Sequence, residues 1–143
     1  HPSLVTTKIW DERYEDIANY EKYLIRNGVL VLKFFLHVSK AEQKRRFMER
    51  LDNPEKNWKF SSSDVAERGH WKEYQDAYED AIRNTASKEA PWYVVPADNK
   101  WFTRVVVAAA VVDAMAGLKL HYPVVGPGKR KELAAARRSL TAE

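Results

Sequence analysis

One near-continuous apolar run, Val-Leu-Val-Leu-Lys-Phe-Phe-Leu-His-Val at residues 29–38, constrains the fold of this chain more than any other feature. The run is rich in β-branched and aromatic residues, and it is too short to cross a bilayer. Such a segment is typical of a strand covered on both faces, as in the parallel sheets of α/β proteins. A second run, Trp-Tyr-Val-Val-Pro at residues 92–96, predicts a second strand. We expect the two strands to be adjacent and parallel, joined by a right-handed crossover.

Segments with helical periodicity lie on either side of the first run. Aromatic and aliphatic side chains recur at helical spacing over residues 10–26, and Asn27-Gly28 predicts the end of that helix. The tetrapeptide Ser39-Lys-Ala-Glu42 has the pattern of a capping box. In this motif the Ser39 hydroxyl accepts from the Glu42 amide, and the Glu42 carboxylate reaches back to the Ser39 amide. A helix is therefore expected over about residues 40–51.

Two further helices are expected, one on each side of the second run. A polar loop over residues 55–64 precedes the first of them, which is predicted over about residues 66–84. The second is expected to be capped by Asp98 or Asn99 and to end at Gly117. Its inward face is predicted to consist of the apolar residues at helical spacing, namely Trp101, Val105, Ala109, Val112 and Met115.

The order of these elements indicates the fold class. Helix, strand, helix, helix, strand and helix are typical of an α/β fold with a parallel sheet and flanking helices. Two strands are too few for such a sheet to be complete, so we expect these elements to form part of a larger domain. The free edge of the first strand and the apolar faces of the sheet predict self-association.

Composition excludes several classes of protein and site. The 143 residues are 45% hydrophobic and 31% charged, which fits one soluble domain. The absence of cysteine excludes disulfides, thiolate zinc sites and cysteine nucleophiles. The histidines have no metal-ligand spacing, so no residue is assigned to a metal. No apolar run is long enough to span a bilayer and no basic leader precedes the runs, so we expect no membrane association and a cytoplasmic location.

The net charge of +4 is unevenly distributed. Residues 40–59 contain seven basic and four acidic residues, and residues 126–143 contain five basic and two acidic ones. A basic segment inside an otherwise slightly acidic body indicates a local anion site. A uniformly basic surface for nucleic acid is not expected.

The basic side chains within residues 40–59 are the strongest functional signal. Arg46 and Arg50 are four residues apart and therefore share a face of the expected helix, and Lys56 and Lys59 follow in the loop. Guanidinium groups bind phosphate oxygens as bidentate forks, and ammonium groups bind them as point charges. The cluster therefore suits a polyanion. The alternative is a solvated face on which nearby acids form ion pairs with these residues.

A glycine-rich phosphate loop is missing from the sequence. Kinases of the P-loop type use Gly-x-x-x-x-Gly-Lys-Ser/Thr or a close variant, whose amides cradle the phosphates. None of the five glycines builds such a loop. The segment Gly126-Pro-Gly-Lys129 has neither the spacing nor a preceding strand.

Four parts of the sequence resemble the polyphosphate kinase 2 family. They are FFLHVSKAEQKRRFMER at residues 34–50, DNPEKNWKFS at residues 52–61, Asp64, and PWYVVPADNK at residues 91–100. The resemblance extends over residues 1–123 and corresponds to the C-terminal half of the family's catalytic domain. It implies a partial P-loop kinase-like three-layer fold, with parallel strands, flanking helices and a helical lid over about residues 39–84. Residues 124–143 would then form a basic C-terminal tail.

The resemblance also implies an activity. Members of this family transfer phosphoryl groups between polyphosphate and nucleoside mono- or diphosphates (ADP/AMP or GDP/GMP), with Mg2+ as cofactor. In the family, the phosphate loop and the acidic motif that serves magnesium precede the region that this chain resembles. The magnesium ligands are therefore expected mainly upstream, and this chain alone is expected to be inactive.

Site residues follow from the same resemblance. The family's lid closes over the phosphates, so Arg46 and Arg50 would stabilise charge in the transition state. Asp64 would orient the lid arginines or a magnesium-bound water. The residues expected to bind the phosphates of polyphosphate or nucleotide are Arg45, Lys56 and Lys59. Whether Arg45 or Arg46 contacts phosphate is left open.

Two other functions remain open at this point. One is a non-catalytic basic module for polyphosphate or nucleic acid, with Lys129-Arg-Lys131 and Arg137-Arg138 carrying the binding. The other is part of a nucleoside or thymidylate kinase. A homo-oligomer is expected because of the uncovered apolar faces. A Gly-rich loop ending in Gly-Lys upstream in the parent reading frame would separate either kinase from the binding module. Polyphosphate-dependent turnover of AMP or ADP by the intact parent would then separate the phosphotransferase from the nucleoside or thymidylate kinase.

Overall fold

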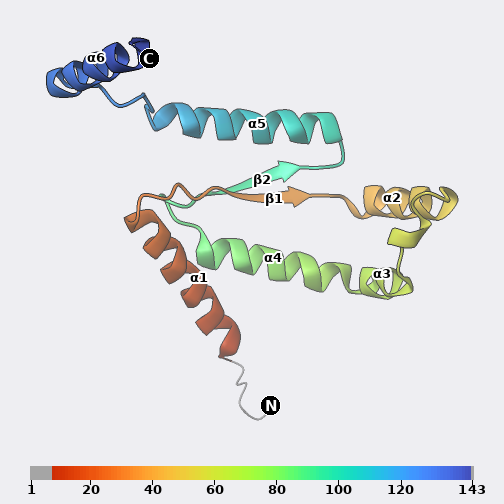
Figure 1. Ribbon diagram of the computed structural model, residues 1–143. Helices are drawn as coiled ribbons and strands as arrows, with labels where there is room; N and C mark the ends of the chain where they lie inside the picture. Colours follow the sequence, from red (N-terminus) through yellow and green to blue (C-terminus); the bar gives the residue numbers. More distant parts are fainter. Residues whose placement is uncertain (1–7, 143) are drawn as a thin grey trace. The chain divides into compact units, whose positions relative to one another are not determined.

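The computed structural model describes residues 8–142 and consists of α-helices, short 3-10 helices and two strands (Figure 1). In chain order these are α1 (Ile9–Arg26), β1 (Lys33–His37), α2 (Lys40–Asp52), η2 (Asn57–Lys59), α3 (Ser62–Glu67), η3 (Arg68–His70), α4 (Trp71–Thr85), β2 (Trp92–Pro96), α5 (Lys100–Gly117) and α6 (Pro127–Thr141). The chain divides into two compact units between Val111 and Val112, within α5. Each unit is described by itself.

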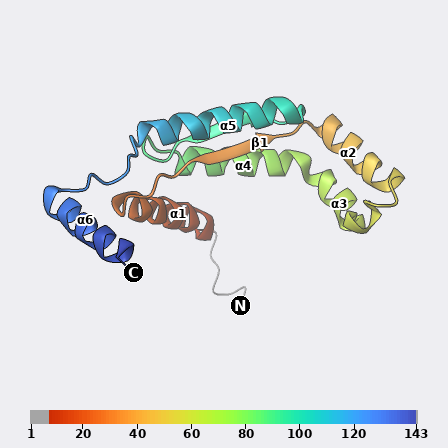
Figure 2. The same ribbon diagram turned by 45° about the horizontal axis from the view of Figure 1, so that its top comes forward.

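A two-stranded parallel sheet lies at the centre of the first unit. Strand β1 pairs with β2 so that Lys33 is opposite Trp92 and His37 is opposite Pro96. Helices α4 and α5 lie on opposite faces of the strands (Figures 1 and 2), and α1 packs against α4. The predicted adjacent parallel pair, with helices between the strands in sequence, is confirmed.

Strand β1 is shorter than its apolar run. Residues 29–32 belong to the run but have no strand partner among the described residues. Pairing begins where the Lys33 amide donates to the Pro91 carbonyl at 3.3 Å, because the chain reaches β2 only at that point. Val29 and Leu30 are each 45% exposed. Hydrophobicity alone therefore overestimates the length of this strand.

The start of α2 contains half of the predicted capping box. The Ser39 Oγ accepts from the Glu42 amide at 3.1 Å, as expected. The Ser39 amide, however, donates to Oδ1 of Asp98 at 2.7 Å, and the Glu42 carboxylate binds arginines further along the helix. A residue at the end of the other strand thus replaces Glu42 in the second half of the motif. Asn99, the other residue predicted as a possible cap, immediately precedes α5.

The segment predicted as a polar loop and one long helix is more finely divided. Helix α3 begins at Ser62, inside the predicted loop, because the Ser61 Oγ caps it by accepting from the Ser63 amide at 3.3 Å. The 3-10 turn η3, which contains Gly69, then separates α3 from α4. The helix predicted over residues 66–84 is therefore a short helix, a turn and a longer helix.

The predicted inward face of α5 is wrong. Its members are exposed, with exposed fractions of 66% for Trp101 and 60% for Val105. Thr103 is buried instead, because its hydroxyl donates to the Pro96 carbonyl at 2.9 Å and so fixes how α5 is rotated against β2. Helix α5 is apolar on nearly all sides, so the spacing of its apolar residues does not select a face.

Few apolar side chains are fully buried among the described residues. Ala90, Val95 and Ala97 are buried, whereas many large apolar residues are exposed. Buried apolar area is the main favourable contribution to folding, so this exposure leaves much of that contribution unused in the isolated chain. It is consistent with the predicted self-association, which stays a prediction.

Candidate functional site

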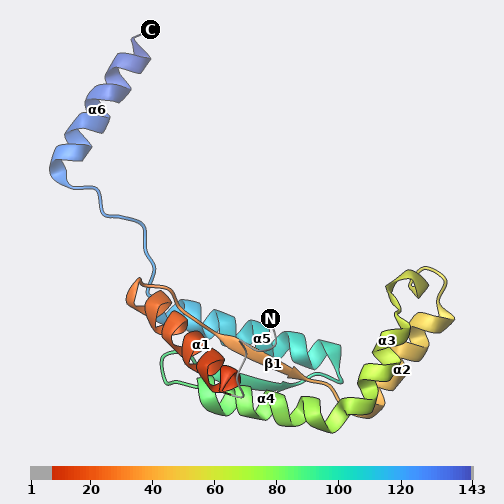
Figure 3. The same cartoon turned by 90° about the horizontal axis from the view of Figure 1, so that it is seen from below.

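The carboxyl ends of β1 and β2 meet at one edge of the sheet, where α2 begins. Beyond this edge α2 and α3 lie side by side as an arm, the α2–α3 arm (residues 40–70; Figure 3). The guanidinium of Arg68 holds the arm together, since its Nη1 donates to the Lys40 carbonyl at 2.7 Å and to Oε1 of Gln43 at 2.8 Å. Ligands of parallel α/β sheets bind outside the carboxyl ends of the strands, so this edge is the place to look for a site.

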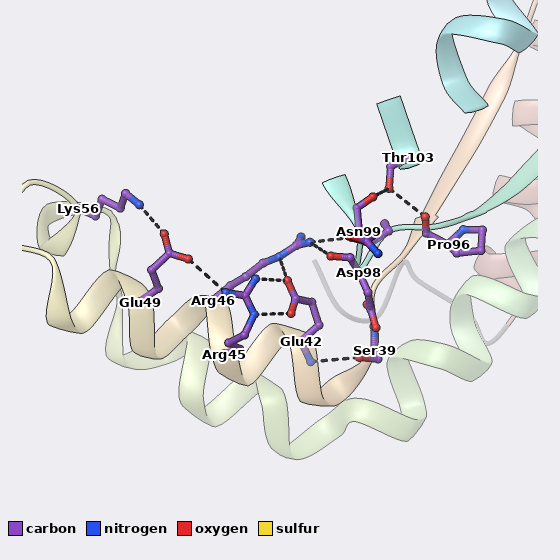
Figure 4. Close-up of polar contacts among 11 residues, drawn as sticks. Ser39, Glu42, Arg45, Arg46, Glu49, Lys56, Pro96, Asp98, Asn99 and Thr103 are labelled. Carbon is purple, nitrogen blue, oxygen red and sulfur yellow. Dashed lines mark hydrogen bonds and ion pairs between the residues drawn. The ribbon is translucent and has the colours of Figure 1, made fainter. Parts of the chain in front are cut away.

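Glu42 organises the base of the arm (Figure 4). Its two carboxylate oxygens accept from Nε and Nη2 of Arg45, each at 2.6 Å. One of these oxygens also accepts from Nε of Arg46 at 2.7 Å. Hydrogen bonding to Arg45 above all, and to Arg46, lowers the pKa of Glu42 to about 2. Glu42 is therefore a carboxylate at any physiological pH, and it neutralises part of the charge of both arginines.

Arg46 connects the arm to the end of β2. Its Nη2 donates to the Ala97 carbonyl at 2.6 Å and to the Asp98 carbonyl at 3.3 Å. Its side chain is 24% exposed, compared with 61% for Arg45. Figure 4 shows its guanidinium pointing from α2 toward the segment that follows β2. Most of the hydrogen-bonding capacity of Arg46 is therefore used by the protein itself.

Arg45 is exposed and Lys56 is partly exposed, and both have acidic partners. Arg45 adds a longer ion pair with Glu49 at 3.7 Å to its contacts with Glu42. Lys56 in the loop donates to the other oxygen of Glu49 at 2.6 Å. Lys56 is also the main cause of the lowered pKa of Glu49. These contacts correspond to the solvated-face alternative for this part of the cluster.

Arg50 and Lys59 have aromatic rather than acidic neighbours. The Arg50 guanidinium lies over the ring of Phe47 at 5.7 Å, and the Lys59 ammonium lies over the ring of Trp58 at 5.0 Å. Within residues 8–142 neither cation has a carboxylate within ion-pair distance. A ring face attracts a cation but does not neutralise its charge. These two side chains are therefore the members of the predicted cluster with the most charge left for an external anion.

Asp64 lies in the wall of a cavity and, within residues 8–142, forms no ion pair with the predicted arginines. The cavity has a volume of about 310 Å³ and is formed between the end of β1, α2, α3 and α4. Five aromatic side chains line it, and polar groups complete the lining; the aromatic residues are Phe35, Phe47, Trp71, Tyr74 and Tyr78. Its polar lining includes Glu67, which accepts from the Tyr74 hydroxyl at 2.5 Å. An aromatic cavity of this size with a few polar groups suits a small flat ligand.

Sequence reasoning missed two residues of this site as functional positions. The sequence predicts Asp98 only as a possible helix cap, yet Asp98 holds the start of α2, and its pKa is lowered chiefly by the hydrogen bond from the Ser39 amide. Asp98 lies two residues after a predicted strand, and a polar residue at that position of a parallel sheet is a usable signal. No comparable signal in the sequence points to Arg68.

The described residues supply no magnesium site of their own. Within residues 8–142 no group of three or more His, Cys, Asp or Glu side chains could hold a metal ion. A hard divalent cation needs several oxygen ligands, so these residues do not fit magnesium as resident ligands.

Within residues 8–142, no helix combines the length and hydrophobicity that crossing a membrane requires.

Comparison with known proteins identifies the family. The model of the family "Polyphosphate kinase 2 (PPK2)" matches residues 3–122. This chain belongs to the polyphosphate kinase 2 family. The resemblance carried by residues 34–50, 52–61, 64 and 91–100 is therefore confirmed at the level of the family.

Similar proteins support this assignment and show how much of each relative the chain covers. It is 48% identical to an ADP-polyphosphate phosphotransferase of Rhodopseudomonas palustris, over 92% of this chain and 45% of that protein. It is 47% identical to an AMP/ADP-polyphosphate phosphotransferase of Meiothermus ruber, over 85% of this chain and 45% of that protein. A Leptolyngbya boryana protein described as "Uncharacterized protein in chlN 3'region" is 51% identical and is covered over 99% of its length.

A solved structure agrees with the fold. The crystal structure of polyphosphate kinase 2 from Arthrobacter aurescens matches with a TM-score of 0.82 and 38% identity, over 94% of this chain and 48% of that one. The mixed α/β architecture with parallel strands and flanking helices is thus that of solved polyphosphate kinase 2 structures. The chain spans about half the length of the two named phosphotransferases and of this structure.

Proposed function

We propose that this chain provides the lid and C-terminal core of a polyphosphate-dependent nucleotide phosphotransferase, a kinase acting between polyphosphate and nucleoside mono- or diphosphates. The observation that carries the proposal is the position of the basic cluster. In a member of the polyphosphate kinase 2 family, it lies on an arm directly beyond the carboxyl ends of two parallel strands. A phosphate loop belongs at the same edge of a P-loop kinase-like sheet, which is the fold we infer for the complete domain.

Charge neutralisation is the chemistry that this arm can supply. Phosphoryl transfer depends mainly on positioning and on stabilising charge on the transferred group, with the attacking and leaving oxygens in line. The attacking phosphate oxygen is already ionised near neutral pH, so no strong general base is needed. Arg50 is the best placed of the arginines, because it has no carboxylate partner within the described part of the chain and can offer a complete bidentate fork.

The remaining cations divide into two roles in this proposal. Arg45 and the lysines Lys56 and Lys59 bind the phosphates of polyphosphate or nucleotide, and Arg45 must share its guanidinium between Glu42 and the ligand. Arg46 acts as a positioning residue, since it ties the base of the arm to the carbonyls after β2. Between Arg45 and Arg46, the proposal therefore takes Arg45 as the phosphate contact.

Asp64 and the aromatic cavity are assigned to the nucleotide. Aromatic side chains offer stacking surface to a nucleobase, and a carboxylate accepts hydrogen bonds from ribose hydroxyls or exocyclic amines. The cavity adjoins the cluster through Phe47, whose ring lines it and also lies beneath the Arg50 guanidinium. A base in the cavity would therefore place its phosphates near Arg50.

A segment exchange tests the proposed function. Residues 3–122 replace the corresponding part of the Rhodopseudomonas palustris relative, and the chimera is assayed with ADP, polyphosphate and magnesium. We expect phosphoryl transfer by the chimera and none by the 143-residue chain alone, because no residue of the chain replaces a phosphate loop. A folded but inactive chimera, or turnover by the isolated chain, would contradict the proposal. Turnover with ATP as phosphate donor and none with polyphosphate would favour a nucleoside kinase instead.

A further inference from the structure

Helix α6 lies outside the part of the chain that the family model matches, and it is strongly basic. The family match ends at residue 122, whereas α6 comprises Pro127–Thr141. It carries five basic side chains and one acidic one, so its net charge is +4. Its side chains are exposed throughout, and it is drawn in blue in Figures 1 and 3. The family model therefore assigns no role to this helix.

Four of the five cations share one side of the helix. At about 100° per residue, Arg130 and Arg137 form one row along the helix, and Lys131 and Arg138 form a second row beside it. Ala134 lies between the rows, and its small side chain does not project between the cations. The two ends of each row are about 10 Å apart at a rise of 1.5 Å per residue. The basic face of α6, defined by these four cations, is thus a double row of positive charge along two helical turns.

Most of this basic face has no internal counter-charge. The fifth cation, Lys129, is the one that pairs with Glu132, at 2.6 Å. Arg130 donates through Nε to the Val125 carbonyl at 3.0 Å, which leaves its charge unneutralised. Among residues 8–142, Lys131, Arg137 and Arg138 have no carboxylate within ion-pair distance. The face therefore presents about four charges to solvent.

The placement of the charges disfavours α6 as an isolated helix. Its first turn contains two cations, Lys129 and Arg130, and no acidic residue, although the helix dipole favours negative charge there. Gly126 at the cap position offers no side-chain hydrogen bond, and no apolar face is buried that would stabilise the helix by packing. A bound polyanion would remove the repulsion between the cations and so stabilise the helix.

The side chains of α6 also indicate which polyanion fits. The helix has no aromatic residue on which a base could stack and no Asn or Gln to read a base edge. Leu133 and Leu140 are its large apolar residues, which is too little to hold a helix in a membrane interface. What remains is recognition of phosphate charge alone by guanidinium and ammonium groups.

We propose that the basic face of α6 binds polyphosphate at a second place, outside the catalytic edge, and tethers long chains to the enzyme. This inference rests on the proposed function for its choice of polyanion. A chain held by α6 has its free part at a raised local concentration near the α2–α3 arm, provided that it is long enough to span the two. The basic face of α6 therefore increases the affinity of the enzyme for long polyphosphate and not for short polyphosphate.

A pair of charge-matched triple variants of the 143-residue chain tests the proposal. The test variant is Lys131→Ala/Arg137→Ala/Arg138→Ala. The control is Lys22→Ala/Arg26→Ala/Lys88→Ala, which removes three exposed cations that have no ion-pair partner within the described residues. Binding of end-labelled long polyphosphate is followed by fluorescence anisotropy over a range of salt concentrations, and helix content is followed by circular dichroism.

We expect the test variant to bind long polyphosphate roughly tenfold or more weakly and to lose about two to three units of salt slope, as for three lost phosphate contacts. The affinity of the control variant for long polyphosphate should fall by less than about twofold, because its three lost cations make no phosphate contact and release no counterions. Addition of polyphosphate should raise the helix content of the unmodified chain and not that of the test variant. Equal losses in both variants, or unchanged binding by the test variant, would overturn the proposal. Duplex DNA or anionic vesicles that bind α6 more tightly than polyphosphate would overturn the choice of partner.

The same substitutions in a chimera extended to residue 142 separate this inference from the proposed function. There the test variant should raise KM several-fold for long polyphosphate and leave kcat, and turnover of short polyphosphate, unchanged. An active chimera that is indifferent to α6 would overturn the tether alone. An inactive chimera, with polyphosphate binding by the isolated chain that still depends on α6, would overturn the proposed function alone.

Discussion

Two polar networks lie at opposite ends of the same pair of strands, and they differ in how completely they are closed. At the start of β1, Lys33 donates to Oε2 of Glu21 and to the Thr85 carbonyl, each at 2.6 Å, and its ammonium lies 5.2 Å from the Trp92 ring centre. The Trp92 indole donates to the Thr85 hydroxyl at 2.9 Å. Both charged side chains are only 11% exposed. This network joins α1, β1, α4 and β2 and leaves nothing for a ligand.

The network at the carboxyl ends of the strands is open. Glu42 and Asp98 hold the start of α2, but one carboxylate serves both Arg45 and Arg46, and Arg50 and Lys59 have none within the described residues. An ion pair that is buried and fully hydrogen-bonded specifies how elements pack. A cluster with more cations than carboxylates attracts anions. The comparison predicts that substitutions at the first network change stability and that substitutions at the second change turnover.

The largest effect is expected for Lys33→Met, which leaves the Glu21 carboxylate buried without a partner. Removing one member of a buried pair costs about 3–5 kcal/mol of unfolding free energy. Urea unfolding of the 143-residue chain measures this loss, with exposed Lys22→Met on α1 as the control. The double variant Lys33→Met/Glu21→Leu should recover much of the stability, because an apolar pair has no desolvation cost. A loss below about 1 kcal/mol for the single variant would place this pair with ordinary surface ion pairs.

The next largest effect is expected for Arg50→Ala in the active chimera. The value of kcat/KM should fall by about 10²–10³, the range for removing a group that stabilises transition-state charge. Stability should change by about 0–1 kcal/mol, since no ion pair is lost. Arg50→Lys should recover little activity, because an ammonium lacks the bidentate fork. Lys44→Ala, which removes an exposed charge from the same helix, is the matched control and should leave turnover unchanged.

The two strands and the basic cluster also show what the sequence could and could not predict. Strand β2 has its predicted bounds, 92–96, because its apolar run is short and ends next to Asp98-Asn99. The basic cluster could be predicted because helical spacing is local information. The sequence could not predict which arginine has no partner within the protein. Arg46 donates to carbonyls that lie 51 and 52 positions further along the chain, and such contacts are not local information. The rotation of α5 depends in the same way on one hydrogen bond from Thr103.

Arg46→Ala is expected to combine both kinds of effect, in contrast to Arg50→Ala. Loss of its hydrogen bonds to the Ala97 and Asp98 carbonyls should cost about 1–3 kcal/mol, because a partly buried carbonyl loses a charged donor. The chimera should also lose turnover, mainly in kcat, since the base of the arm is no longer held at the end of β2. Denaturation and steady-state kinetics on the same preparation measure the two effects. Unchanged stability with a large loss of polyphosphate binding would return Arg46 to the role of a phosphate ligand.

A smaller effect concerns pH and Glu42. The pKa of Glu42 is about 2 in the folded chain, below its ordinary value of 4.5, so the folded state binds its proton less readily than the unfolded state does. The stabilisation from this carboxylate is therefore complete above about pH 5 and decreases as the pH falls through 4.5 toward 2. The difference in unfolding free energy between the chain and Glu42→Gln should be largest at pH 6 and should be smaller at pH 3.5. A difference that stays constant over this interval would show that other groups control the acid sensitivity.

The smallest effect is expected for Lys59→Ala. The Lys59 ammonium lies over the exposed ring of Trp58 and acts on a phosphate chain as one point charge in solvent. Its removal should raise KM for polyphosphate by only a few fold and leave kcat unchanged. The salt dependence of log KM should lose about one unit of slope, as for one phosphate contact in counterion release. Lys88→Ala removes an exposed lysine with no assigned role and should keep the full slope. If Lys59→Ala also keeps the full slope, Lys59 does not contact polyphosphate, and the free charge of the open network is confined to Arg50.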